Sequence, residues 1–222
     1  MSNVPVRRLS GAQPRRGGAL RAVALGGALA LLAIPSGKFA SAAPKSATLT
    51  ILQTTDLHGN LLPWDYLRAR PADVGLARIA SRVSAIRKER GPANVLLLDA
   101  GDTIQGTPLE FVHARNVATG KAAATPDPMA LAMSTIGYDA LAVGNHEFNF
   151  GLEVLRKAEK ESRFPWLSAN TRKRDGSPAF REYAVFARAG VRACVLGLVT
   201  PNIPSWEPEA NRPGLAFEDP VV

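Results

Sequence analysis

Short apolar runs alternate along the chain with longer segments in which apolar residues recur every three or four positions. Runs rich in Val, Ile, Leu and Thr predict buried β-strands at 48–54, 94–98 and 138–143. Helical spacing of apolar residues predicts helices between these strands, at 74–90 and 128–136. The order β-α-β-α-β favours an α/β fold with a largely parallel sheet that helices cover on both faces.

The second half of the chain continues this pattern with shorter elements. Two more helices are predicted at 107–115 and 151–160. Three more strands are predicted at 165–169, 183–187 and 191–199, the last two joined as a hairpin through Arg188, Ala189 and Gly190. The Pro-rich segment 201–220 is predicted to be a loop. No internal repeat is visible, so one domain or a little more is expected.

The first 42 residues have the pattern of a cleavable export signal. Basic residues precede an apolar run at 22–34, and Ala40, Ser41 and Ala42 form a small-residue cleavage site. This run is too short to span a bilayer as a helix, so an uncleaved anchor is the weaker alternative. We expect an exported protein, periplasmic or extracellular and without a stable membrane anchor, whose mature chain begins at Ala43. Two arginine pairs in the leader leave twin-arginine export open.

The basic character of the chain comes mostly from this leader. Of the 222 residues, 27 are Lys or Arg and 19 are Asp or Glu, which gives a formal net charge of +8. Six of the basic residues and none of the acidic ones precede Ala43. The remaining charges nearly balance, so the composition does not point to a nucleic-acid polymer as partner.

The sequence contains a single cysteine, Cys194. It excludes an intramolecular disulfide. Because Cys194 lies within the apolar run 191–199, we expect a buried structural thiol without a nucleophilic role.

Polar residues follow each of the first three predicted strands. The first strand leads into Asp56 and His58, the second into Asp102, and the third into Asn145 and His146. Because the carboxyl ends of parallel strands lie along one edge of a sheet, these side chains are expected to converge there. Each has an ordinary alternative role, such as a turn residue or a helix cap, but three such groups in succession favour a common site.

Metal-assisted hydrolysis is the chemistry that suits this mixture of imidazole, carboxylate and carboxamide. Mixed nitrogen and oxygen ligands favour Zn, Mn, Fe or Co over Ca or Mg. A bridging aspartate would hold two divalent ions about 4 Å apart, and such ions activate water as a nucleophile. Glycines beside the ligands, Gly59, Gly101 and Gly144, would allow close approach to a phosphate.

The three motifs DLHGN, GDTIQGTPL and GNHEFNFG resemble, in order and spacing, the first three metal motifs of the calcineurin-like metallophosphoesterases. The resemblance covers roughly residues 48–206. It is greatest to the exported group that contains the 5′-nucleotidases and the 2′,3′-cyclic-nucleotide 2′-phosphodiesterase/3′-nucleotidases. It implies a four-layer α/β/β/α fold, two divalent metal ions and a nucleotide substrate.

The resemblance also implies roles for individual residues. Asp56 and His58 would hold one metal ion and Asn145 the other, with Asp102 bridging both. His146 would protonate or stabilise the departing oxygen. The 5′-nucleotidases have Asp where this chain has Asn149, whereas the FNFG form is similar to the cyclic phosphodiesterase branch. An Asn at this position would favour the protonated form of His146 less than Asp would.

Two features of the family are missing from these 222 residues. The family completes its metal site with further His residues downstream, including a G-H-x-H run, and places nucleotide recognition in a C-terminal domain. The one remaining histidine, His113, is expected to be a surface or packing residue. Residues 43–222 therefore resemble the N-terminal part of the metallophosphatase domain, which by itself would bind metal weakly or turn over slowly.

The expected activity is hydrolysis of a nucleotide phosphoester, with a 2′,3′-cyclic-nucleotide 2′-phosphodiesterase/3′-nucleotidase as first choice. A 5′-nucleotidase or UDP-sugar hydrolase is the nearest alternative. A sulfur-oxidation hydrolase and a catalytically inactive metal- or nucleotide-binding fragment are further alternatives.

Overall fold

A computed structural model describes residues 46–221, which belong to one compact unit, Ala43–Val222. The predicted leader and its cleavage site lie outside the described residues. Within residues 46–221, none of the helices has the length and apolar character needed to cross a membrane.

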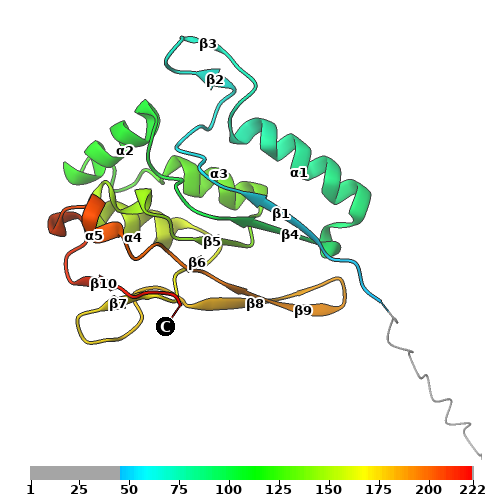
Figure 1. The fold of residues 1–222 in the computed structure, drawn as a ribbon. Helices are drawn as coiled ribbons and strands as arrows, with labels where there is room; N and C mark the ends of the chain where they lie inside the picture. Colours follow the sequence, from blue (N-terminus) through cyan, green and yellow to red (C-terminus); the bar gives the residue numbers. More distant parts are fainter. Residues whose placement is uncertain (1–45, 222) are drawn as a thin grey trace, which may run out of the picture. The chain divides into compact units, whose positions relative to one another are not determined.

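A four-stranded parallel sheet forms the centre of the fold (Figure 1). Its strands are β1 (Thr50–Thr54), β4 (Val95–Asp99), β5 (Ala140–Ala142) and β6 (Trp166–Leu167), in the spatial order β1-β4-β5-β6. β4 is buried on both faces, as its sequence of three consecutive leucines after Val95 predicts. The predicted α/β class with a parallel sheet is therefore confirmed.

Four helices pack on one face of this sheet. They are α1 (Leu76–Arg90), α2 (Pro108–Ala118), α3 (Pro128–Ile136) and α4 (Gly151–Glu161). Their apolar side chains form the main core together with Leu97, Leu141 and Trp166 of the sheet. The prediction of helices on both faces is wrong. Because the strands follow one another in chain order without a reversal, right-handed crossovers place every connecting helix on the same side.

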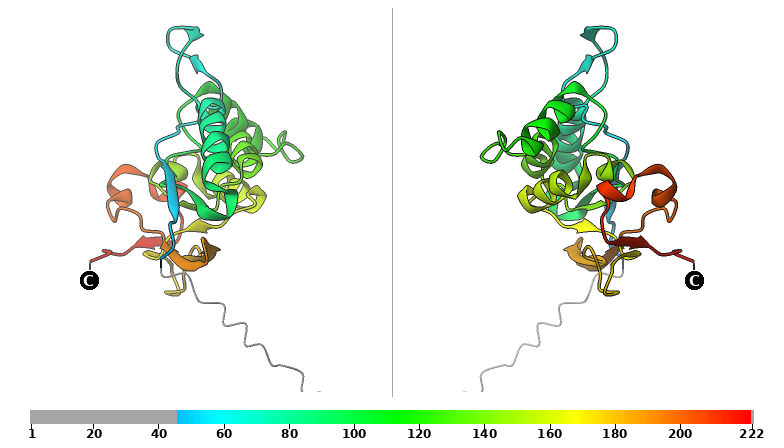
Figure 2. Two further views of the ribbon diagram at one scale, coloured as in Figure 1. Left: turned by 90° about the vertical axis from the view of Figure 1, so that its right-hand side faces the viewer. Right: turned by 90° about the vertical axis from the view of Figure 1, so that its left-hand side faces the viewer.

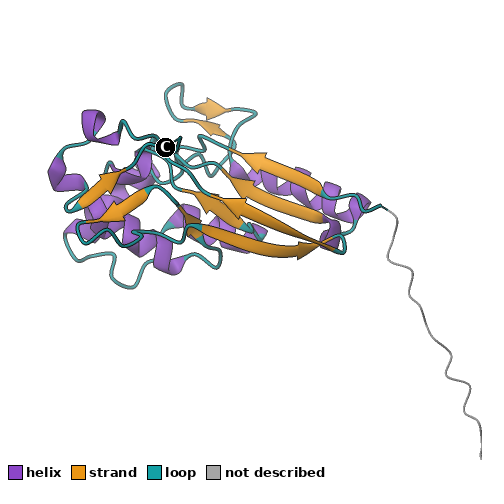
Figure 3. Cartoon of the chain, turned by 60° about the horizontal axis from the view of Figure 1, so that its bottom comes forward, coloured by secondary structure: helices purple, strands orange, loops and turns teal. Residues whose placement is uncertain are grey.

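An antiparallel hairpin packs on the opposite face of the sheet (Figure 3). It consists of β8 (Tyr183–Arg188) and β9 (Val191–Leu196), as predicted. Its inner face contacts the sheet through a small core of Ala140, Leu167 and Ala184. Its outer face is exposed, and Cys194 lies on it opposite Val185. The expectation of a buried thiol is therefore wrong, because no element within residues 46–221 covers this side of the hairpin.

The segment 201–220 contains regular structure and is not a simple loop. It includes α5 (Ile203–Trp206), a 3-10 turn at Glu209–Asn211 and β10 (Leu215–Phe217). β10 pairs antiparallel with β7 (Thr171–Lys173). Asn170 fixes this arrangement, since its amide nitrogen donates to Val199 O at 2.7 Å and Glu218 O at 2.8 Å. The prediction of a loop is wrong because these elements are short and depend on pairing with distant parts of the chain.

A small hairpin projects between β1 and α1 (Figure 2). Its strands, β2 (Trp64–Asp65) and β3 (Arg70–Pro71), have only two residues each. The Asp65 carboxylate accepts hydrogen bonds from the backbone N–H groups of Leu67 and Arg68, both at 3.0 Å, and so fixes the turn. Sequence periodicity does not predict so short a hairpin.

A cluster of ionisable side chains is buried between α2 and α3. Asp127 caps α3 by accepting from Ala130 N at 2.8 Å, and its other oxygen lies 3.9 Å from Nε2 of His113. Glu110 is buried beside Asp127, and burial together with the Asp127 charge raises the pKa of Glu110 to about 9. Of the two roles expected for His113, the structure assigns it the packing role.

Candidate metal centre

Two loops at the carboxyl ends of β1 and β4 are joined by backbone hydrogen bonds. Asp56 N donates to Gly101 O at 3.0 Å, and His58 N donates to Asp102 O at 2.9 Å. These bonds extend the parallel pairing of β1 and β4 beyond the last paired residues, Thr54 and Asp99. The metal-ligand candidates from two strands are thereby held at one edge of the sheet, as the sequence predicts.

Three of the candidate ligands adopt the left-handed backbone conformation. The φ angles are 53° at Asp56, 46° at His58 and 61° at Asp102. This conformation is uncommon for residues other than glycine and costs free energy, and such residues cluster at functional sites. The surrounding hydrogen bonds maintain this conformation and hold the three side chains at the sheet edge.

Glycines allow the loops of the site to approach one another closely. A Cβ atom at Gly101 would lie 2.5 Å from the backbone nitrogen of Gly144, and a Cβ atom at Gly144 would collide with Oδ1 of Asp102. Gly101 also has a φ of 95°. These glycines are needed for contact between loops, in addition to any role in approach to a phosphate.

The ring of His58 is oriented by the loop after β4. Its Nδ1 lies 3.1 Å from the carbonyl oxygen of Gln105 and 3.3 Å from the side-chain oxygen of the same residue. Two oxygen acceptors favour a proton on Nδ1, which leaves the lone pair of Nε2 free for a metal ion. Nε2 lies 3.7 Å from Oδ1 of Asp56. Gln105 is therefore a supporting residue that the sequence analysis missed.

His58, Asp102 and His146 bring one ligand atom each within 4.8 Å of one another. The rings of His58 and His146 meet edge to face, with centroids 5.0 Å apart. Oδ1 of Asp102 accepts a hydrogen bond from His146 N at 2.9 Å, and its second oxygen makes no such bond. The Asp102 carboxylate therefore lies between the two imidazoles.

The side chain of Asn145 does not cap the short 3-10 turn that follows it, His146–Phe148, although Asn145 occupies the N-cap position. This excludes the ordinary alternative role for Asn145, in which its side chain would accept from a backbone N–H group of the turn. The carboxamide remains available to a ligand.

Glu147 connects all three loops from beneath the site. It is fully buried, and its carboxylate accepts from Thr103 N at 2.6 Å, Gly144 N at 2.7 Å and Asp102 N at 2.9 Å. Burial raises the pKa of Glu147 to about 7 although these three donors favour the ionised form. The sequence analysis noted this residue in the motif without assigning it a role.

Asn149 orients His146 and is in turn oriented by Glu207. Nδ1 of His146 lies 2.7 Å from the amide oxygen of Asn149, and the amide nitrogen of Asn149 donates to the Glu207 carboxylate. Asn211 also donates to Glu207, at 3.1 Å. Glu207 therefore fixes the orientation of the Asn149 amide, and Nε2 of His146 is left free. The sequence analysis missed Glu207 because it lies in the segment interpreted as a loop.

The residues present fit a site for divalent cations. Two imidazoles each have Nδ1 bound to an oxygen acceptor, which directs Nε2 toward a metal ion. Carboxylates from Asp56 and Asp102 and the carboxamide of Asn145 add oxygen ligands of the kind that transition metals accept together with imidazole. The strained backbone of Asp56, His58 and Asp102 indicates that this arrangement is kept for a function.

Comparisons with known proteins support this interpretation. The 2′,3′-cyclic-nucleotide 2′-phosphodiesterase/3′-nucleotidase of Yersinia enterocolitica is 33% identical over 186 residues, which are 78% of this chain and 28% of that protein. Protein UshA of Salmonella pullorum is 38% identical over 182 residues, 81% of this chain and 30% of that protein. The chain therefore spans less than a third of the length of these curated relatives.

Among solved structures, the calcineurin-like phosphoesterase YfkN from Bacillus subtilis superimposes with a TM-score of 0.67 at 33% sequence identity. The superposition covers 79% of this chain and 55% of that chain. The calcineurin-like phosphoesterase family matches residues 49–202, which include every candidate ligand described above. The chain belongs to the calcineurin-like phosphoesterase family.

Proposed function

We propose that this protein hydrolyses phosphoesters of nucleotides with the help of two divalent metal ions. The observation that carries the proposal is the convergence of His58, Asp102 and His146 ligand atoms within 4.8 Å, at the carboxyl ends of three strands. Relatives that carry the names of nucleotide phosphodiesterases and nucleotidases support the substrate class.

In this proposal each ligand has a separate task. Asp56 and His58 hold one ion, Asn145 holds the second, and Asp102 bridges the two. When bound, the ions would polarise the phosphate oxygens and supply an activated water for attack on phosphorus. The identity of the metal is left to measurement, since Zn, Mn, Fe and Co all suit this set of ligands.

His146 has the task of protonating the departing oxygen. Asn149 keeps the proton of the neutral ring on Nδ1, so the second proton of the imidazolium is carried on Nε2, the atom that is free to donate it. Asn149 is a positioning residue in this account, and Glu207 holds it in place. A histidine held by hydrogen bonds in this way loses little entropy on reaching the reactive geometry.

We favour the 2′,3′-cyclic-nucleotide 2′-phosphodiesterase/3′-nucleotidase activity and export to the periplasm or the cell exterior. The proposal rests on the FNFG motif around Asn149 and on the Yersinia relative. A 5′-nucleotidase activity is the second candidate, because the UshA relative is slightly more similar, at 38% identity.

A panel of nucleotides tests the proposal and separates the two candidates. Phosphate release is measured from 2′,3′-cyclic, 3′- and 5′-nucleotides with the protein expressed from its complete reading frame. Turnover of the cyclic and 3′-substrates supports our first choice, and turnover of 5′-nucleotides alone supports the second. Absence of metal-dependent turnover on every member of the panel contradicts the proposal.

A further inference from the structure

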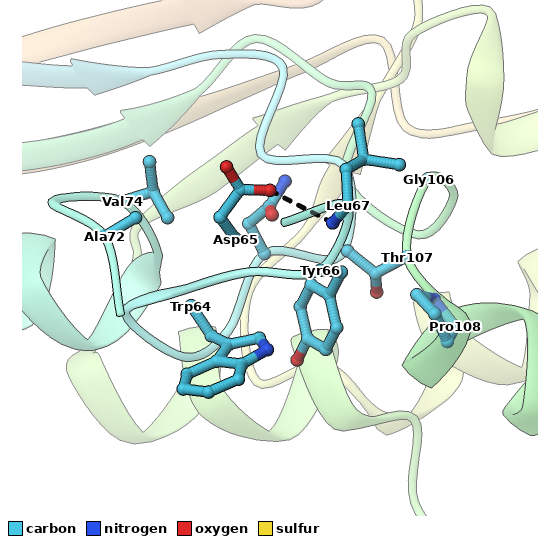
Figure 4. A pocket seen from close by; sticks show the side chains of 10 residues that line it. Trp64, Asp65, Tyr66, Leu67, Ala72, Val74, Gly106, Thr107 and Pro108 are labelled. Atoms are coloured by element: carbon cyan, nitrogen blue, oxygen red, sulfur yellow. Dashed lines mark hydrogen bonds between the residues drawn. The ribbon is translucent and has the colours of Figure 1, made fainter. Parts of the chain in front are cut away.

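A cavity of about 390 Å³ lies beside the candidate metal centre, between the β2–β3 hairpin and the start of α2 (Figure 4). Trp64 and Tyr66 line it from the hairpin, and Thr107 and Pro108 line it from the α2 side. Its volume lies within the range of cavities that bind small organic ligands. None of its aromatic residues has a role in the metal centre.

The walls of this cavity are fixed. Thr107 Oγ1 donates to Gly59 O at 3.0 Å, which joins the α2 side to the loop after β1. On the hairpin side, Trp64 pairs with Pro71 and Asp65 pairs with Arg70. Cavities with preformed walls bind a ligand without the entropy cost of ordering them.

The cavity is continuous with the metal-ligand loop. Asn60, two residues after His58, lines the cavity. Gly106 also lines it, and a Cβ atom at Gly106 would lie 2.7 Å from Cβ of His58 and 2.8 Å from His58 O. A phosphoester held at His58 would therefore have its organic substituent directly beside this cavity.

We propose that the cavity lined by Trp64, Tyr66 and Asn60 binds the nucleobase of the substrate. This inference rests on the proposed function, and it assigns base recognition to residues within this part of the chain.

The chemistry of the lining residues fits a nucleobase. The flat indole of Trp64 offers a surface for stacking by any base. The Trp64 N–H group and the Tyr66 hydroxyl add polar groups for hydrogen bonding. The amide nitrogen of Asn60 donates to Leu57 O at 2.9 Å and His58 O at 3.3 Å, so its amide oxygen is the atom that can accept from an exocyclic amine. An aliphatic or strongly charged substituent would use few of these features.

Substrates with and without a base test the inference in the active protein. We compare a nucleoside monophosphate with the matching ribose phosphate in wild type, Trp64→Ala and Tyr183→Ala. Tyr183 is the matched control, because it is an exposed aromatic residue on the outer hairpin. Trp64→Ala should lower kcat/KM roughly 5- to 100-fold for the nucleotide, the range for loss of one base–aromatic stack, and leave the ribose phosphate nearly unchanged.

Equal effects of Trp64→Ala on both substrates, or no effect on either, would overturn the inference. Tyr66→Phe provides a second variant that removes only a hydroxyl group. It should weaken the nucleotide preference less than Trp64→Ala, and an effect as large on ribose phosphate would count against a base site.

Binding of a nucleoside tests the cavity without any hydrolysis. Adenosine is titrated into the chain while the indole N–H signals of its three tryptophans are followed by NMR, with the Trp64 signal assigned from Trp64→Phe. Adenosine should shift the Trp64 signal, and ribose should not. An unmoved Trp64 signal up to the solubility limit of adenosine overturns the inference even if the protein is an active nucleotidase. A shift in a protein without turnover supports the base site and counts against the proposed function alone.

Discussion

The amide oxygen of Asn149 lies 2.7 Å from Nδ1 of His146. Amide oxygen and nitrogen atoms are assigned from their hydrogen-bond partners, and here the partner of the nitrogen is the carboxylate of Glu207. The negative charge that other family members place directly beside the histidine is therefore one hydrogen bond further away in this chain. His146, Asn149 and Glu207 act as a unit.

This unit predicts the outcome of Asn149→Asp. The new carboxylate would face the Glu207 carboxylate, so two like charges replace a donor and an acceptor, and the variant should lose stability at neutral pH. Asn149→Asp combined with Glu207→Gln restores a donor opposite the new carboxylate, and its melting temperature should recover. In the double variant, the limb of the kcat/KM profile that reports protonated His146 should extend about one pH unit higher. A single variant as stable as wild type would contradict the contact with Glu207.

Replacement of His146 by alanine separates its catalytic role from a role as ligand. If it protonates the leaving group, His146→Ala should keep its metal ions and lose roughly 10² to 10⁴ in rate. The loss should be smaller for a nitrophenyl ester, because a nitrophenolate departs without protonation. Metal content measured beside the rates decides the matter, since loss of an ion would identify His146 as a ligand, as its distance to His58 and Asp102 permits.

Glu147 is expected to control the stability of the metal loops. Glu147→Gln keeps the shape but turns an amide group toward one of three backbone donors, which should cost about 1 to 3 kcal/mol. Urea unfolding of the metal-free chain measures this cost. Glu153→Gln on the exposed surface of α4 is the control and should have no effect. An equal, small effect of both substitutions would show that Glu147 does not hold the loops.

Glu110 gives the fold a dependence on pH that is separate from the metal centre. Its pKa in the folded chain, about 9, is above the ordinary 4.5, so the folded state binds the proton more tightly than the unfolded state. Its contribution to stability is therefore complete below pH 4.5 and is lost as pH rises toward 9. Glu110→Gln mimics the protonated group and should remove a decline of up to about 1.4 kcal/mol per pH unit.

Unfolding free energies at pH 5 and pH 8.5 check this prediction. Relative to wild type, Glu110→Gln should be more stable at pH 8.5 than at pH 5. An unchanged difference between the two proteins across this range would show that Glu110 titrates normally.

The sequence predicts the strands and ligands well because both signals are local. Each strand is a short apolar run, and the residue that follows it carries the polar group, so Asp56, Asp102 and Asn145 can be placed at one sheet edge without any tertiary information. The parallel pairing of β1, β4 and β5 agrees with that placement.

The features that were missed depend on contacts between distant residues. Glu207 meets Asn149 across 58 positions of the chain, and Gln105 meets His58 across 47. The exposure of Cys194 depends on what covers β9, which its alternating apolar pattern does not reveal. The placement of all helices on one face follows from strand order, a property of the whole sheet.

The central claim is that Asp102 and its neighbours hold the metal ions that drive hydrolysis of a nucleotide phosphoester. The most direct test measures metal content and phosphate release together, in the protein expressed from its complete reading frame. Wild type should lose its activity on treatment with a chelator and regain it with Mn or Zn, whereas Asp102→Ala should bind fewer ions and stay inactive after the same addition. Wild-type turnover that survives complete removal of metal, or an Asp102→Ala variant with both ions and an unchanged kcat, would contradict the account.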